Sequence, residues 1–117
     1  MRALLPVFLI LAGLARADET ADRAAIRKVL ATFNNLRERS TVLAPGADLD
    51  RLRRFSGQEV SQVYFEARAI RFVNQDVAFV DAAASQFGTL IIMHAMPAYF
   101  VLLRIGGEWR VAVMRVP

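Results

Sequence analysis

The chain has 117 residues, which is the size of one domain. It contains no cysteine, so disulfide bonds and thiolate metal sites are excluded. The formal net charge of +4 comes from 15 Lys and Arg against 11 Asp and Glu, and we expect no nucleic-acid interface because no segment concentrates the basic residues.

The first 17 residues have the pattern of a secretory signal peptide. Arg2 supplies a positive charge, the apolar stretch Ala3–Ala15 follows, and Ala15-Arg16-Ala17 has the small-residue spacing of a cleavage site. The apolar stretch is shorter than the roughly 20 residues that span a bilayer, so we expect no stable membrane insertion. A retained anchor or a buried helix stays open as the alternative. We predict cleavage after Ala17, a mature domain over residues 18–117, and a secreted or periplasmic location.

A helix is predicted over Asp18–Ser40. Its apolar residues recur every three to four positions and form one buried stripe, made of Ala25, Ile26, Val29, Leu30, Phe33 and Leu36. The charged and amide side chains, among them Arg23, Arg27 and Asn34, fall mostly off that stripe.

A turn at Pro45-Gly46 follows the predicted helix. Asp48 is a plausible N-cap for a short helical turn after it. In that turn Leu49, Leu52 and Phe55 point inward, while Arg51, Arg53 and Arg54 form a solvated outer side.

The rest of the chain predicts four strands. Apolar and polar residues alternate along the first strand until the phase slips at Ile70, which indicates a β-bulge or a bend. The last two strands form a hairpin across Ile105–Glu108, where Gly106 and Gly107 supply the positive backbone angles of a tight turn. The predicted strands are Glu59–Val73, Val77–Gly88, Tyr99–Arg104 and Trp109–Arg115.

This order predicts an α+β fold, in which a curved antiparallel sheet of about four strands wraps around one long N-terminal helix. Three runs, Ala78–Ala84, Ala98–Ile105 and Trp109–Val116, are apolar on both alternating faces. One helix covers one face only, so the other face needs a partner. We expect a homodimer through the sheet face, burying on the order of 800 Å² on each copy.

Several segments resemble the nuclear transport factor 2-like superfamily, particularly its SnoaL-like and unassigned bacterial members. Ala24–Leu30 with Phe33-Asn34 resembles the family's opening helix, Leu43–Asp48 its short turn, Ala69–Asp81 its central hairpin, and Gly107–Ala112 its last strand. The resemblance implies a cone-shaped, often dimeric fold with a cavity between helix and sheet. It implies no single chemistry, because that fold hosts isomerases, dehydratases, cyclases and plain binding modules.

Asp81 is the main candidate for chemistry because it lies in mid-strand between Val80 and Ala82. Apolar surroundings disfavour the charged form of a carboxyl, which can then serve as an acid or a base. The alternative is that Asp81 faces solvent or pairs with an arginine such as Arg71 or Arg110.

The predicted ligand-binding residues are Phe33, Tyr64, Asp81 and Tyr99. The single histidine, His94, has no neighbouring Cys, Asp or Glu, so we expect no metal site and no cofactor. We expect an exported homodimer that binds a small apolar ligand or a partner protein without catalysis. The alternative is an isomerase, dehydratase or cyclase that uses Asp81 as acid or base.

Overall fold

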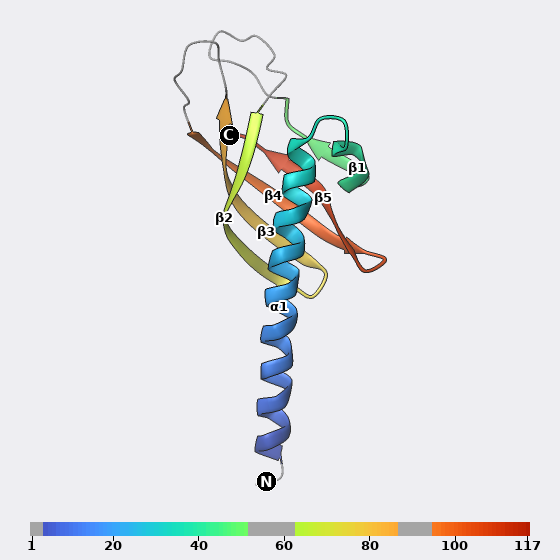
Figure 1. Cartoon of the computed structure of the whole chain (residues 1–117), viewed down its shortest axis with the longest axis vertical. Helices are drawn as coiled ribbons and strands as arrows, with labels where there is room; N and C mark the ends of the chain where they lie inside the picture. Colours follow the sequence, from blue (N-terminus) through green and yellow to red (C-terminus); the bar gives the residue numbers. More distant parts are fainter. Residues whose placement is uncertain (1–3, 52–62, 87–94) are drawn as a thin grey trace.

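The computed structural model describes residues 4–51, 63–86 and 95–117. Within these residues one long helix, α1 (Leu4–Asn34), packs against one face of a curved sheet of five strands (Figure 1). This is the predicted α+β architecture. The other elements are the 3₁₀-helix η1 (Arg39–Val42) and the strands β1 (Leu43–Leu49), β2 (Val63–Asn74), β3 (Val77–Gln86), β4 (Ala95–Ile105) and β5 (Glu108–Arg115).

The sheet has the order β1-β5-β4-β3-β2. Strands β2 to β5 form the predicted antiparallel meander, and the hairpin between β4 and β5 turns at Gly106 and Gly107 with φ of 59° and 82°. Register also shifts between Ala67 and Ala69 on β2, close to the predicted phase slip. These local predictions are confirmed.

The prediction of four antiparallel strands is wrong by one strand, because β1 adds to β5 in parallel and makes the sheet mixed. Leu43 pairs with Val111 and Leu49 with Met114. The segment between Leu43 and Asp48 leaves the register, with Gly46 at φ 70°, so the turn residues interrupt the strand without ending it.

The predicted helix cap at Asp48 is therefore wrong, since Asp48 lies within β1. Its carboxylate accepts a hydrogen bond from Arg115 at 2.5 Å instead. Arg51 is exposed. The remaining predictions for this region and the next connection, on Leu52, Arg53, Arg54, Phe55 and His94, lie outside the described residues.

Helix α1 ends at Asn34, earlier than the predicted Ser40, and its backbone extends back to Leu4. Its N-terminal half projects beyond the sheet (Figure 1). Among the described residues, no helix is both long enough and apolar enough to cross a membrane. Leu36 follows the helix and is 49% exposed, so the buried stripe stops at Phe33.

The core lies between α1 and the inner face of the sheet, the face that α1 covers. Ile26, Leu30 and Phe33 of the helix are buried in it. Phe33, Phe65 and Phe100 meet edge to face, with ring centroids 5.1–5.6 Å apart, and all three are at most 2% exposed. These rings fill the space between helix and sheet.

Polar side chains of α1 also bond to the backbone of β2, which is an edge strand. The Asn34 amide donates to the Phe65 carbonyl at 2.9 Å and accepts from the Phe65 N–H at 2.8 Å, as a neighbouring strand would. Arg23 donates to the Ile70 carbonyl at 2.6 Å, and Arg27 to the Ala67 carbonyl at 3.5 Å. The helix thus occupies hydrogen-bonding groups that an edge strand otherwise leaves open to other chains.

Replacing Asn34 by alanine is expected to lower the free energy of unfolding by about 1–3 kcal/mol, because the buried Phe65 loses partners for both its N–H and its C=O. Urea denaturation measures this loss. Asn35→Ala is the matched control, because within the described ranges the exposed Asn35 side chain bonds only to the nearby Arg37 N–H. Equal losses for the two variants would contradict the role given to Asn34.

Candidate functional site

The outer face of the sheet, which points away from α1, carries a group of apolar side chains on β3, β4 and β5. Phe79 lies beside Val101, Val101 beside Val113, and Val77 beside Leu103. Because neighbours in register touch across a sheet, these side chains form one continuous surface. Each of them is half-buried in the single chain. We call this surface the apolar patch; its members are Val77, Phe79, Tyr99, Val101, Leu103 and Val113.

Aromatic and charged side chains organise the patch and its margin. The Phe79 and Tyr99 rings stack with centroids 5.3 Å apart, and the Arg71 guanidinium lies 4.9 Å from the centre of the Phe79 ring. At the β5 margin, Arg115 bonds to Asp48, and this hydrogen bond raises the pKa of the Arg115 guanidinium above its ordinary value. The Arg115 side chain at that margin therefore stays positively charged at any physiological pH.

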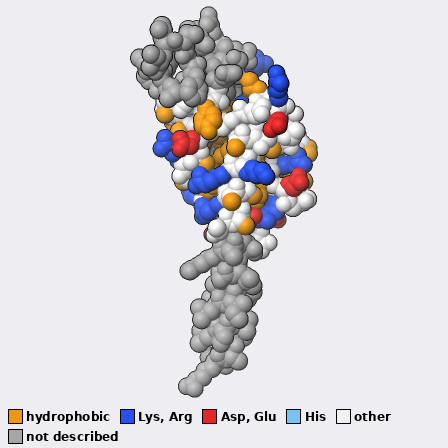
Figure 2. All heavy atoms as spheres, viewed as in Figure 1, with side chains coloured by type: hydrophobic (Ala, Val, Ile, Leu, Met, Phe, Trp, Pro, Cys, Tyr) orange, Lys and Arg blue, Asp and Glu red, His pale blue; other side chains and the backbone are white. Residues whose placement is uncertain are grey.

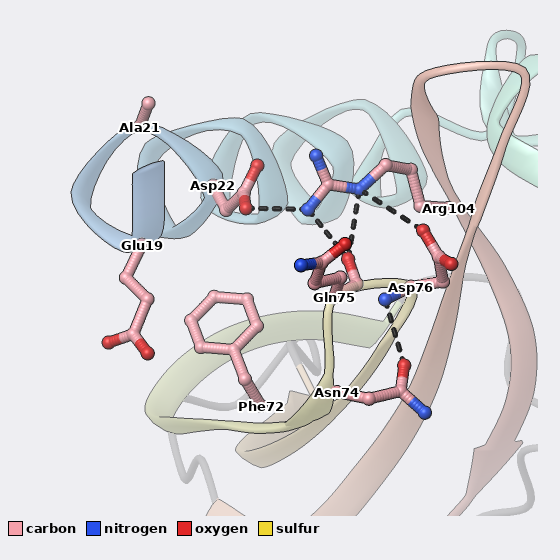
Figure 3. A pocket seen from close by; sticks show the side chains of 8 residues that line it. All are labelled: Glu19, Ala21, Asp22, Phe72, Asn74, Gln75, Asp76 and Arg104. Carbon is pink, nitrogen blue, oxygen red and sulfur yellow. Dashed lines mark hydrogen bonds and ion pairs between the residues drawn. The ribbon is translucent and has the colours of Figure 1, made fainter. Parts of the chain in front are cut away.

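A second feature is an open hollow of about 600 Å³ between α1 and the turn that joins β2 to β3. Figure 3 shows its lining, in which Arg104 reaches from β4 toward the helix and the turn. The hollow is lined by Glu19, Ala21, Asp22, Phe72, Asn74, Gln75, Asp76 and Arg104.

Asp22, Asp76 and Arg104, three of the four charged side chains that line this hollow, are engaged with one another. Arg104 donates to the Asp22 carboxylate at 2.6 Å and to the Gln75 carbonyl at 2.7 and 3.0 Å, and it lies 3.8 Å from the Asp76 carboxylate. The Trp109 indole N–H donates to the other oxygen of Asp22 at 3.2 Å. These bonds join the helix to β4, β5 and the β2–β3 turn and stabilise its position on the sheet. We call the group Asp22, Gln75, Arg104 and Trp109 the lock.

The surface on the α1 side is polar by comparison. Figure 2 shows basic side chains spread over this side of the molecule, with acidic side chains among them. Arg27 and Lys28 of α1 are both exposed. The apolar patch therefore lies on the opposite side of the sheet from the charged helix surface.

Comparison with known proteins relates the chain to others by fold. No family model and no curated protein matches the sequence. An NTF2-like protein of unknown function from Shewanella baltica matches at 13% identity and a TM-score of 0.58, over 81% of this chain and 91% of that one. A designed NTF2 protein matches at 11% identity and a TM-score of 0.62, over 85% of this chain and 99% of that one.

A candidate scytalone dehydratase from Novosphingobium aromaticivorans matches at 11% identity and a TM-score of 0.59, over 87% of this chain and 88% of that one. The chain has the fold of the nuclear transport factor 2-like superfamily. At these identities the likeness shows the NTF2-like fold alone, and any function has to be argued from the residues of this chain.

The fold divides the predicted ligand-binding residues between different surfaces. Phe33 is fully buried on the inner face, and Tyr64 is 52% exposed on β2. Asp81 and Tyr99 face each other across β3 and β4, so the structure does bring these two together. They share the outer face with Phe79, however, and not the interior where Phe33 lies.

Asp81 is exposed in the single chain. The solvent-facing alternative therefore describes its position. The cavity that the family resemblance implies between helix and sheet is occupied by Phe33, Phe65 and Phe100. The apolar patch thus lies on the open outer face, and three phenylalanines fill the part of the interior next to Phe33.

The lock around Asp22 was missed because its members are far apart in the sequence. Asp22 precedes Arg104 by 82 positions and Trp109 by 87. Each residue has an ordinary local setting, and the sequence carries no spacing signal for the group.

Replacing Asp22 by alanine is expected to lower the free energy of unfolding by about 1–3 kcal/mol, because the buried Trp109 indole N–H loses its acceptor and Arg104 loses its link to the helix. Urea denaturation tests this. Glu19→Ala serves as the control: Glu19 is exposed and 4.0 Å from Arg23, so its loss should cost less than about 0.5 kcal/mol. A wild-type stability for Asp22→Ala would show that the lock does not hold the helix.

Proposed function

We propose that this protein is an exported NTF2-like domain that acts by binding and not by catalysis, and that a second copy of the chain binds the apolar patch. The observation that carries the proposal is the patch itself. Six adjacent apolar side chains lie on the face that α1 leaves uncovered. A patch that continuous on the surface of a small domain is typical of an interface.

The edges of the sheet favour association through the face. At β2, the side chains of Asn34, Arg27 and Arg23 occupy backbone groups of the strand. At β1, Pro45 has no N–H to donate and the strand leaves its register before Asp48. Both edges are therefore poor templates for another strand.

We favour a protein as the partner because the described residues give less support to small-ligand binding and to catalysis. Phenylalanine rings occupy the interior where a small apolar ligand was expected, and the hollow beside α1 is lined by charged groups that bond to each other. The exposure of Asp81 gives acid–base catalysis less support than the burial expected for it would have given. A self-complementary interface through the patch uses the apolar surface without needing any further site.

Export is supported by the position of the contacts between α1 and the sheet, which involve residues after the predicted cleavage site. Asp22 and Arg23 are bonded to the sheet, whereas the N-terminal half of the helix projects past it (Figure 1). Cleavage after Ala17 places Asp18 and Glu19 in the first helical turn, where carboxylates interact favourably with the helix dipole. Removal of residues 1–17 would thus leave these contacts of the folded domain in place.

Light scattering after size-exclusion chromatography is expected to give twice the mass of one chain for the purified protein at micromolar concentration. Val101→Lys is expected to give the mass of one chain with an unchanged circular-dichroism spectrum, because it places a charge at the centre of the patch. Leu36→Lys, an equal change at an exposed residue beyond α1, should leave the dimer intact. A wild-type monomer would overturn the proposal.

The protein expressed with residues 1–17 in a bacterial host is expected to be recovered outside the cytoplasm with Asp18 as its N-terminus, as N-terminal sequencing and intact mass will show. Ala15→Leu combined with Ala17→Leu should block processing, since the cleavage site requires small residues at both positions. Ala12→Leu, within the apolar stretch, should not. Recovery of unprocessed wild-type protein in the cytoplasm would refute export.

A further inference from the structure

Two charged residues beside the apolar patch stand without an ion pair within the described part of the chain. Asp81 is exposed on β3, and none of the described basic groups forms a salt bridge with it. Arg71 is exposed on β2 and its guanidinium contacts only the face of the Phe79 ring, at 4.9 Å, among the contacts of the described side chains. The two charges have opposite sign and lie on the same outer face.

Their positions are related through Phe79. Arg71 is the register partner of Phe79 on the neighbouring strand, and Asp81 lies two residues beyond Phe79 on β3, so it points to the same face. The two charged groups therefore lie on different sides of Phe79, separated by one strand spacing and two residues. They are neighbours in the sheet, yet no ion pair joins them within one chain.

A two-fold symmetric interface brings residue i of one copy onto residue j of the other and j onto i. When two copies stack face to face, the symmetry axis lies in the plane between the sheets. An axis that crosses β3 close to Phe79, midway between Asp81 and Arg71, exchanges the positions of these two residues. Phe79 then lies next to its own counterpart, near the axis.

We infer that in the dimer Asp81 of each copy forms an ion pair with Arg71 of the other, so that two reciprocal pairs fix how the apolar patches meet. This inference rests on the proposed dimer. Apolar surface alone is non-directional, whereas opposite charges at its margin select one register and oppose others. The partner is thus a second copy in one defined orientation.

The two arginines that β5 places on the outer face are already engaged. Arg115 bonds to Asp48 at 2.5 Å and lies 3.6 Å from Asp50. Arg110 bonds to Glu108 at 3.2 Å and to the Thr41 carbonyl at 3.1 Å. Pairing Asp81 with either would break an existing contact within the chain, whereas Arg71 gains its first carboxylate.

Charge reversal tests the pairing. The dimer dissociation constant, measured by sedimentation equilibrium, is expected to rise about tenfold or more in Asp81→Arg and in Arg71→Asp, because each places like charges opposite one another. The double variant, Asp81→Arg with Arg71→Asp, is expected to return to within about threefold of wild type, since the pairs are restored with exchanged signs. Asp81→Asn, which only removes the charge, should give an intermediate value.

The controls separate this effect from net charge and from folding. Glu38→Arg makes the same change in charge as Asp81→Arg at an exposed residue between α1 and η1, away from the outer face, and should leave the dissociation constant unchanged. Thermal unfolding followed by circular dichroism identifies any variant that does not fold. Asp81→Asn then provides the test in its place.

The outcomes distinguish the two proposals. A wild-type monomer overturns the dimer and this pairing with it. If the wild type is a dimer and Asp81→Arg has the same dissociation constant as Glu38→Arg, the dimer stands and the pairing is overturned. Single variants that weaken the dimer without recovery in the double variant also overturn the pairing, because the losses are then independent.

Discussion

Both faces of the sheet carry apolar side chains, and the single helix α1 can cover only one of them. The rest of the structure depends on this constraint. Ile26, Leu30 and Phe33 of α1 bury the inner face together with Phe65 and Phe100. The apolar patch of the outer face is left without cover from the described residues. Because buried apolar area is the main favourable term in folding and association, the uncovered face is where a partner gains most.

The same helix also limits how the chain can associate. Asn34 binds the edge of β2 as a neighbouring strand would, and Asp22 holds the helix to Arg104 and Trp109. The helix therefore contributes side chains to the core, covers the edge of β2 and is held to the sheet by hydrogen bonds. A domain built in this way leaves its outer face open, and this is why we propose assembly through that face.

Local patterns predicted the elements well, and long-range contacts could not be predicted. The buried positions Ile26, Leu30 and Phe33, the glycine turn at Gly106-Gly107 and the slip near Ile70 each depend on neighbouring residues. Leu36, also placed on the stripe, is exposed because the helix ends before it. Strand β1 was missed because Pro45-Gly46 is a strong local turn signal, while its pairing with β5 joins distant segments. Asn34 was placed off the buried stripe for the same reason, since its partner Phe65 lies 31 positions away.

The central claim is that the outer face of the sheet binds a second copy of this chain. An NMR experiment on an equal mixture of isotope-labelled and unlabelled protein, filtered for contacts between copies, examines that face directly. The account predicts intermolecular nuclear Overhauser effects from the methyl groups of Val101, Leu103 and Val113 to the aromatic protons of Phe79. Intermolecular effects confined to α1 or to the sheet edges, or none at all in a protein that tumbles as a single chain, would contradict it.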